Sequence, residues 1–188
     1  MSHTVVGRLQ LPAGTGARGL QVILEVENEA STYYEWLDLD QTWGFRTSVD
    51  GAVNTLEVVA GIDRTIYALD ADALKPFTSG GTVDVGTIDL RASLHTHTFK
   101  LVSDTAPALR IGMWFEEPPA DVSLGSRQFP EVAAGAASSW LLPTTFETVY
   151  FLVEKPADEQ RGRDWSSGAQ HLFGPFTSAE LPGELRVP

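Results

Sequence analysis

The stretch Leu20-Gln21-Val22-Ile23-Leu24-Glu25-Val26 decides the fold class, because every second side chain along it is apolar. Successive side chains of a β-strand point to opposite faces, so this period of two predicts a strand with one face in a core. The side chains predicted to face the core are Leu20, Val22, Leu24 and Val26, and those predicted to face outward are Gln21, Ile23 and Glu25.

The same alternation occurs in other parts of the chain. Residues 36–40 alternate, and residues 82–90 are rich in the β-branched side chains that favour strands. A strand over residues 109–116 is predicted to point Leu109, Ile111, Met113 and Phe115 inward and Arg110, Gly112, Trp114 and Glu116 outward. The helical signal is one turn at residues 70–75 and a weak pattern at residues 131–139. Many short strands separated by Gly- and Pro-containing turns predict an all-β sandwich or barrel.

The sequence also contains an internal repeat, because pairs of similar segments follow one another in the same order in its two halves. The matched pairs are His3-Thr4 with His95-Thr96, residues 20–22 with 109–111, residues 65–69 with 148–152, and residues 76–79 with 175–178. The offset varies from pair to pair, as expected when strands are kept and loops change length. We therefore predict two domains, residues 1–91 and 92–188.

Composition and charge narrow the function classes. The chain has 188 residues, no cysteine and a net charge of −12. Without cysteine it has no disulfide scaffold, thiol nucleophile or Cys-ligated metal. The negative field repels phosphate backbones and anionic lipid surfaces, so we expect no nucleic acid partner and no membrane insertion. Residues 1–8 lack the pattern of a secretory signal, and we expect the protein to be cytoplasmic or part of a supramolecular particle.

Several features of the first half occur together in a known family. They are an opening strand at residues 6–12, a Gly- and Ala-rich loop before Leu20, a Gly-aromatic turn at Trp43-Gly44-Phe45 and a closing strand at residues 83–90. In this respect the first half resembles a transthyretin-like sandwich of the carboxypeptidase regulatory-like kind. The resemblance implies two tandem transthyretin-like (Ig-like) antiparallel β-sandwiches, with the second more divergent. It implies adhesion, structural or accessory roles rather than one activity.

Candidate catalytic and metal-binding residues are few. His95 and His97 are two residues apart, so on a strand both imidazoles project from one face and could bind one divalent metal. Two exposed histidines on an edge strand are the preferred interpretation. Asp38 and Asp40 share a strand face in the same way and are interpreted as solvated acids. The sequence has neither a G-x-S-x-G elbow nor a phosphate-binding loop, so we predict no catalytic residue and no cofactor.

One enzymatic relative of the family hydrolyses 5-hydroxyisourate, opens with a His-containing strand and ends in a Tyr-Arg-Gly-Ser signature. Leu94-His95-Thr96-His97 resembles that opening, but residues 183–188 do not carry the closing signature. A metal-dependent or hydroxyisourate-type hydrolase centred on His95 and His97 is therefore the third hypothesis for the function.

The aromatic side chains support the two leading hypotheses. Trp114 is predicted on the polar face of its strand, and Tyr33, Tyr34 and Trp36 lie together beside acidic residues. Exposed Trp and Tyr beside charges are typical of protein interfaces. In one interpretation these rings pack between the two sandwiches of the chain, with Trp114 covered by the neighbouring domain. In the other, which we carry forward, these four residues bind a partner. The chain is then a non-catalytic binding or structural module making protein–protein contacts as a homo-oligomer or in a larger assembly. The alternative is a carbohydrate-binding module with Trp and Tyr platforms.

Overall fold

The computed structural model describes residues 2–12, 18–120, 122, 129–157 and 169–188. Strands make up most of this part of the chain, which confirms the predicted all-β, sandwich-type fold. The predicted helical turn is also present, as α1 (Ala71–Leu74) followed by the 3-10 turn η1 (Lys75–Phe77). Asp70 caps α1 by accepting a hydrogen bond from the Ala73 backbone N–H at 2.9 Å. No helix among the described residues is long and apolar enough to span a membrane.

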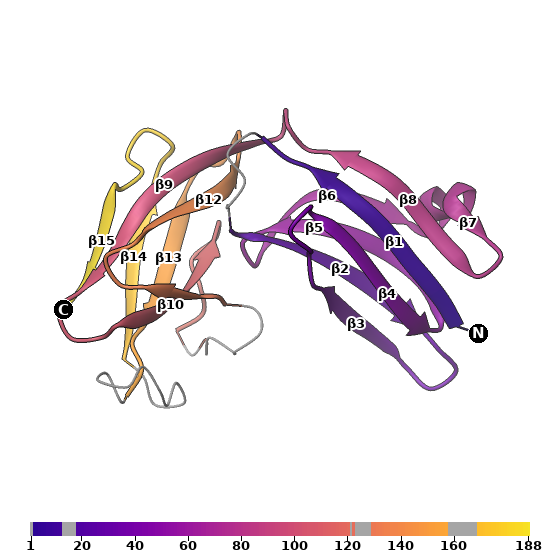
Figure 1. The fold of residues 1–188 in the computed structure, drawn as a ribbon, viewed down its shortest axis with the longest axis horizontal. Coiled ribbons are helices and arrows are strands. Elements are labelled where there is room, and N and C mark those ends of the chain that lie inside the picture. The colour runs from indigo at the N-terminus through magenta and orange to yellow at the C-terminus, as the bar shows by residue number, and fades with distance from the viewer. Residues whose placement is uncertain (1, 13–17, 121, 123–128, 158–168) are drawn as a thin grey trace. The chain divides into compact units, whose positions relative to one another are not determined.

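The described chain forms two compact units. Unit 1 contains residues 2–12, 20–60 and 65–95, and unit 2 contains residues 18–19 and 61–64 together with the described residues of 96–188. The sheets of unit 1 have the strand orders β4-β1-β8-β7 and β3-β2-β5-β6 (Figure 1). Its strands are β1 (Ser2–Gln10), β2 (Leu20–Glu27), β3 (Thr32–Leu37), β4 (Gly44–Asp50), β5 (Ala52–Ala60), β6 (Arg64–Asp70), β7 (Thr78–Ser79) and β8 (Thr82–Asp89).

The core of unit 1 is built from the inward side chains of both sheets. On β2 the predicted alternation is present, with Val22, Leu24 and Val26 fully buried. Their cross-strand partners on β5 include Leu56 and Val58, which are buried as well. The other sheet contributes Val5, Leu9, Phe45, Val49, Val83, Val85 and Ile88. Burying each such side chain contributes about 1.5–3 kcal/mol, so this apolar layer dominates the stability of the unit.

Gly7 lies in the middle of β1, where the backbone passes close to two buried side chains. A Cβ atom at Gly7 would come within 2.4 Å of the Phe45 ring and 2.5 Å of a Val85 methyl group. We expect Gly7→Ala to lower the free energy of unfolding by about 1–3 kcal/mol in urea denaturation, because the core would have to shift to admit the methyl group. Gly183→Ala is the matched control, since its Cβ would meet no described atom within 4 Å. Equal losses in the two variants would contradict this packing.

Asp89, the last residue of β8, forms an exposed ion pair with Arg91. The Arg91 Nη2 and Nε atoms donate to the Asp89 carboxylate at 2.7 and 2.9 Å, and the Arg91 backbone N–H donates at 3.1 Å. These side-chain and backbone hydrogen bonds lower the pKa of Asp89 to about 2. Because this pKa lies below the ordinary value of about 3.9, the pairing stabilises the fold above pH 4 or so and that stabilisation is lost as the pH falls toward 2.

An NMR titration of the side-chain carboxyl carbon measures this pKa directly. We expect a midpoint of about 2 for Asp89 in the wild-type protein. In Arg91→Ala the midpoint should rise toward the ordinary value, because both side-chain donors are removed. A midpoint that stays unchanged in Arg91→Ala would show that the ion pair does not set this pKa.

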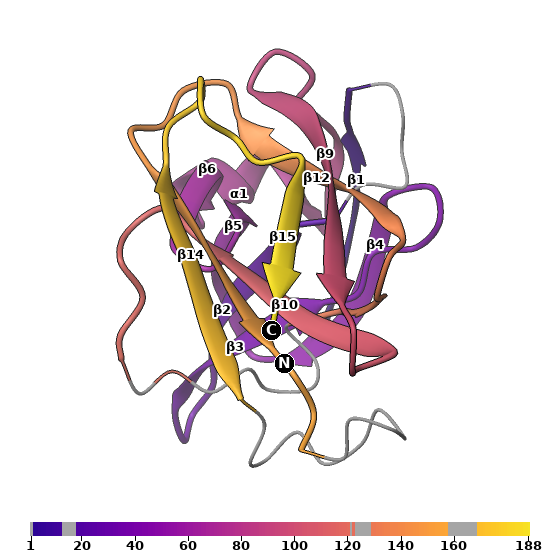
Figure 2. The same cartoon turned by 90° about the vertical axis from the view of Figure 1, so that its left-hand side faces the viewer.

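Unit 2 is also built from two sheets, with the strand orders β12-β9-β15 and β11-β10-β13-β14. Figure 2 shows β15 beside β9, with which it pairs in parallel. Three rings form the centre of the core: Phe99 lies 5.9 Å from Trp140 and 5.0 Å from Phe151 between ring centroids. The strands are β9 (Leu94–Ser103), β10 (Ala108–Trp114), β11 (Glu131–Ala133), β12 (Ala137–Pro143), β13 (Val149–Glu154), β14 (Gln170–Phe176) and β15 (Glu184–Val187). Residues 131–139, for which the sequence pattern predicts no definite helix, form β11 and the start of β12.

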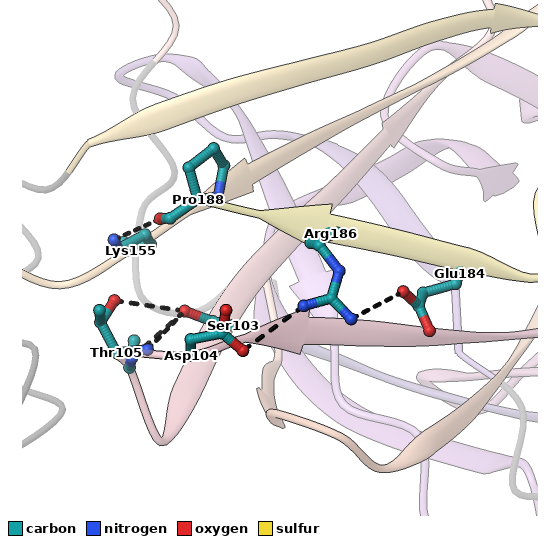
Figure 3. Close-up of polar contacts among 8 residues, drawn as sticks. Ser103, Asp104, Thr105, Lys155, Glu184, Arg186 and Pro188 are labelled. Atoms are coloured by element: carbon teal, nitrogen blue, oxygen red, sulfur yellow. Dashed lines mark hydrogen bonds and ion pairs between the residues drawn. The ribbon is translucent and has the colours of Figure 1, made fainter.

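Polar contacts hold the last strand of unit 2 in place (Figure 3). Arg186 of β15 bridges Asp104 at 3.4 Å and Glu184 at 3.3 Å. The Lys155 Nζ atom donates to the carbonyl oxygen of Pro188 at 2.7 Å. The exposed Arg186 pairs contribute little each, whereas the buried Leu185 and Val187 of the same strand supply apolar area to the core.

The two units have the same strand order. β4-β1-β8 corresponds to β12-β9-β15, and β3-β2-β5-β6 corresponds to β11-β10-β13-β14. In each unit the first strand pairs in parallel with the last strand. This correspondence keeps the sequence match of residues 20–22 with 109–111, because β2 corresponds to β10. It corrects the match of residues 65–69 with 148–152, because β6 corresponds to β14, whereas residues 149–154 form β13. The domain division between residues 91 and 92 stays a prediction.

Candidate binding face of unit 1

One face of the β3-β2-β5-β6 sheet carries exposed aromatic rings beside carboxylates. Trp36 of β3 lies opposite Ile23 of β2, and Tyr34 lies opposite Glu25. On the other side of β2, Ile23 pairs with residue 57 and Glu25 with residue 55. Paired side chains of an antiparallel sheet share a face, so these residues form two rows across three strands. We name this surface the unit 1 outer face; its residues are Ile23, Glu25, Glu27, Tyr34, Trp36, Thr55 and Glu57.

The outer face is exposed because the opposite sides of the same strands fill the core. Tyr34 is 56% exposed and Trp36 is 48% exposed. By contrast, Val22 and Leu24, whose side chains point from β2 into the core, have no exposed surface. Tyr34 and Trp36 are two residues apart on β3, so their Cα atoms lie about 7 Å apart. A large exposed ring buries much area on binding at a small cost in side-chain entropy, so this pair is suited to contact a ligand.

The outer face is also negatively charged. The negative charge of Glu25 and the hydrogen bond that Glu25 accepts from the Tyr34 phenol raise the pKa of Tyr34, with further contributions from burial and from the charge of Glu57. Glu57 accepts a hydrogen bond from the Thr65 hydroxyl at 3.1 Å. Glu27 accepts a hydrogen bond from the side-chain amide of Asn54 on β5 at 3.1 Å. Strands β2, β3 and β5 contain no lysine or arginine, so these carboxylates are not neutralised by a cation from the same three strands.

The structure brings together two of the four residues predicted to bind a partner. Tyr34 and Trp36 share the outer face, as their spacing on one strand requires. Tyr33 lies on the other side of β3, opposite the buried Val26, and is half-buried. Tyr33 therefore supports the edge of the core and does not join the ring pair.

Trp114 lies on the side of β10 opposite Ile111 and Met113, as predicted, but it is covered there and not exposed. Trp114 is only 4% exposed, and Arg110 and Gly112, which were also predicted to face outward, are buried. Trp114 belongs to a second apolar cluster with Phe129 and Leu152. This outer side of β10 is covered by residues of unit 2 itself, so Trp114 has almost no surface to offer a partner.

The two histidines weighed as metal ligands have other surroundings. His97 is half-buried on β9, where its Nε2–H donates to the carbonyl oxygen of Pro182 at 2.8 Å and its ring lies 6.0 Å from that of Phe99. His95, two residues earlier, is half-buried too, so the interpretation of both as exposed residues is wrong. Among the described residues, no group of three or more His, Asp or Glu side chains is placed to hold a metal ion.

Asp40 is a turn residue rather than half of a carboxylate pair. One carboxylate oxygen accepts hydrogen bonds from the Thr42 backbone N–H at 2.7 Å, the Thr42 hydroxyl at 2.8 Å and the Gly44 N–H at 2.9 Å. These bonds, with that of the Thr42 hydroxyl first, lower the pKa of Asp40. They stabilise the tight turn before β4, in which Trp43 has a φ of 63°.

Unit 2 has an open hollow of about 430 Å³, and Asp63 lies in its wall. Asp63 accepts backbone hydrogen bonds from Phe115 and Glu116, each at 2.8 Å. Both carboxylate oxygens are thus engaged in holding the end of β10, and this geometry is that of a structural residue.

Sequence reasoning placed Ile23 and Glu25 outward but did not connect them with Tyr34 and Trp36. The missing information was the register of β3 on β2, which sequence alternation alone does not give. The charge pattern offered a usable signal, since residues 20–37 contain four glutamates, two tyrosines and one tryptophan without any lysine or arginine. The sequence around Glu57 has no comparable charge pattern. Glu57 joins the outer face only because β5 pairs with β2.

No protein family model matches this chain, and no curated protein matches it. Among solved structures, the chain is similar to a DUF3823 family protein from Parabacteroides merdae ATCC 43184, with 11% sequence identity and a TM-score of 0.29. The match covers 81% of this chain and 89% of the other. A similarity this low does not support an inference about function. The proposed function therefore rests on the geometry of the outer face.

Proposed function

We propose that this chain is a non-catalytic binding module that makes protein–protein contacts through the unit 1 outer face, as a component of a larger assembly. The observation that carries the proposal is the pair Tyr34 and Trp36, two large rings exposed on the same face of β3. Exposed Trp and Tyr concentrate the binding energy of protein interfaces. The rigid sheet beneath them fixes their positions before binding, which reduces the entropy lost on association.

We further propose that the two units are transthyretin-like sandwiches. The opening strand β1, the turn at residues 40–44 that places Trp43 before Phe45, and the closing strand β8 support this assignment. The equal strand order of the two units supports their origin from one duplicated sandwich. On such a scaffold the binding specificity comes from surface residues and not from the fold itself.

Site-specific photo-crosslinking tests the proposed function. Benzoylphenylalanine is introduced in place of Tyr34 in one variant and in place of Phe77 in another, and each is irradiated in extract of the native source. Phe77 is the matched control because it is an exposed aromatic residue of unit 1 on η1, away from the outer face. We expect a defined crosslinked protein from position 34 and none from position 77. Crosslinks from position 77 alone, or from neither position, would contradict the proposal.

A carbohydrate-binding module is the second candidate, and the same ring pair favours it. Sugar rings stack on aromatic faces, and their hydroxyls donate hydrogen bonds to carboxylates such as Glu25 and Glu57. Titration with glucan, chitin and peptidoglycan oligosaccharides tests this candidate. Binding that is lost in Trp36→Ala would support it, whereas no binding to any of the three would remove it.

A further inference from the structure

Unit 2 contains a surface equivalent to the unit 1 outer face. In unit 1 the central strand β2 pairs Ile23 with residue 57 and Glu25 with residue 55. In unit 2 the central strand β10 pairs Gly112 with Leu152 and Trp114 with Tyr150. The sequence match of residues 20–22 with 109–111, extended along the two strands, sets Trp114 against Glu25 and Gly112 against Ile23. Through the cross-strand pairs, Leu152 is then set against residue 57.

In unit 2 this equivalent surface is covered by the chain itself. The Phe129 ring stacks on Trp114 with a centroid distance of 5.6 Å and an interplanar angle of 21°. Gly112 makes room for it, since a Cβ atom there would lie 2.4 Å from the Phe129 ring. Partly buried Val122 packs on the same cluster. A segment of polypeptide with an aromatic side chain is therefore the occupant of this sheet face in unit 2.

The corresponding surface of unit 1 differs in charge from that of unit 2. Glu25 and Glu57 stand where unit 2 has Trp114 and Leu152, and Tyr34 and Trp36 are exposed beside them. A purely apolar segment would bury these two negative charges without a cationic partner, which costs free energy. A second copy of this chain docking face to face would bring the carboxylates of both copies together. An occupant that carries cationic side chains meets neither penalty.

We propose that the unit 1 outer face binds an extended segment of a partner protein in which arginine or lysine flanks an aromatic side chain. This inference rests on the proposed function and adds the chemistry of the partner. The guanidinium group of such an arginine stacks on the Trp36 and Tyr34 rings. Its N–H groups donate hydrogen bonds to the carboxylates of Glu25 and Glu57. The aromatic side chain of the segment packs on Ile23, where Phe129 lies over Gly112 in unit 2.

Fluorescence anisotropy with labelled synthetic peptides tests the inference. The probe peptide has two Arg-Phe-Arg triplets separated by glycine, and its counterpart has glutamate in place of every arginine. We expect the arginine peptide to bind the wild-type chain, and the glutamate peptide not to bind. Binding should weaken at least about tenfold in the double variant Glu25→Gln and Glu57→Gln, and it should weaken further with added salt.

The charge-matched control is the double variant Glu117→Gln and Glu147→Gln, which removes two exposed carboxylates of unit 2. It should bind the arginine peptide as tightly as the wild type does. Equal weakening in the two double variants would overturn the inference, because it would show a general effect of net charge. Absence of arginine-peptide binding would also overturn it. In that case a crosslink from position 34 to a native protein would leave the proposed function standing, whereas absence of that crosslink would remove both.

Discussion

Replacing Tyr34 and Trp36 together by alanine should weaken partner binding by at least about a hundredfold and leave the fold intact. Truncating an aromatic hot-spot residue of an interface costs about 2 kcal/mol or more, which is about thirtyfold in affinity. The two rings lie on one strand face, so we expect their effects to combine. Both side chains are about half exposed, so their removal takes little apolar area from the core. Surface plasmon resonance with the partner identified by crosslinking measures the affinity.

The matched control for this double variant is Phe77→Ala. Phe77 is an exposed aromatic residue of unit 1 that does not lie on the outer face, and its removal should leave the affinity unchanged. Thermal unfolding midpoints of all variants should agree with that of the wild type within a few degrees. Retained affinity in the double variant would show that the partner binds elsewhere.

Replacing Phe129 by alanine should lower the stability of unit 2 strongly, because Phe129 covers the second apolar cluster. Phe129 is 5% exposed and covers Trp114 and Leu152, so its loss removes a buried ring and opens the cluster to water. Phe→Ala changes in cores cost about 3–5 kcal/mol, and we expect about 3 kcal/mol here because the cluster lies outside the main core. Urea denaturation measures the loss.

Acrylamide quenching of tryptophan fluorescence gives a second readout for Phe129→Ala. Quenching should increase, because Trp114 becomes accessible when its covering ring is removed. Gly112→Ala should act in the same direction with a smaller effect, since its methyl group would displace the Phe129 ring. Unchanged quenching and unchanged stability in Phe129→Ala would contradict the packing of this segment on β10.

Local sequence pattern predicted the strands well, because burial on one face leaves a period of two in the sequence. The alternation of residues 20–26 gave the inward set of β2, and the β-branched residues 82–90 gave β8. The single helical turn was also predictable, since Asp70 is a favourable N-cap residue. These features depend on neighbours in sequence, so one sequence suffices to find them.

The sequence did not predict what covers each sheet. The alternation of residues 109–116 was correct for the inward residues, but Trp114 and Gly112 were taken as outward because no local pattern reveals that Phe129 folds over them. The same limit applies to His97, whose partner Pro182 lies 85 residues later. Long-range contacts of this kind leave no periodic signal, and they decide which of two similar sheet faces is open.

Hydroxyl-radical footprinting of the chain alone and in complex with its native partner tests most directly where the partner lies. The oxidation rates of Tyr34 and Trp36 should fall severalfold in the complex, because both rings are exposed in the free chain and would be covered. The rates at Phe77 and Leu172, which are also exposed, should stay the same. Unchanged oxidation of Tyr34 and Trp36, together with protection of another surface, would show that the unit 1 outer face is not the binding surface.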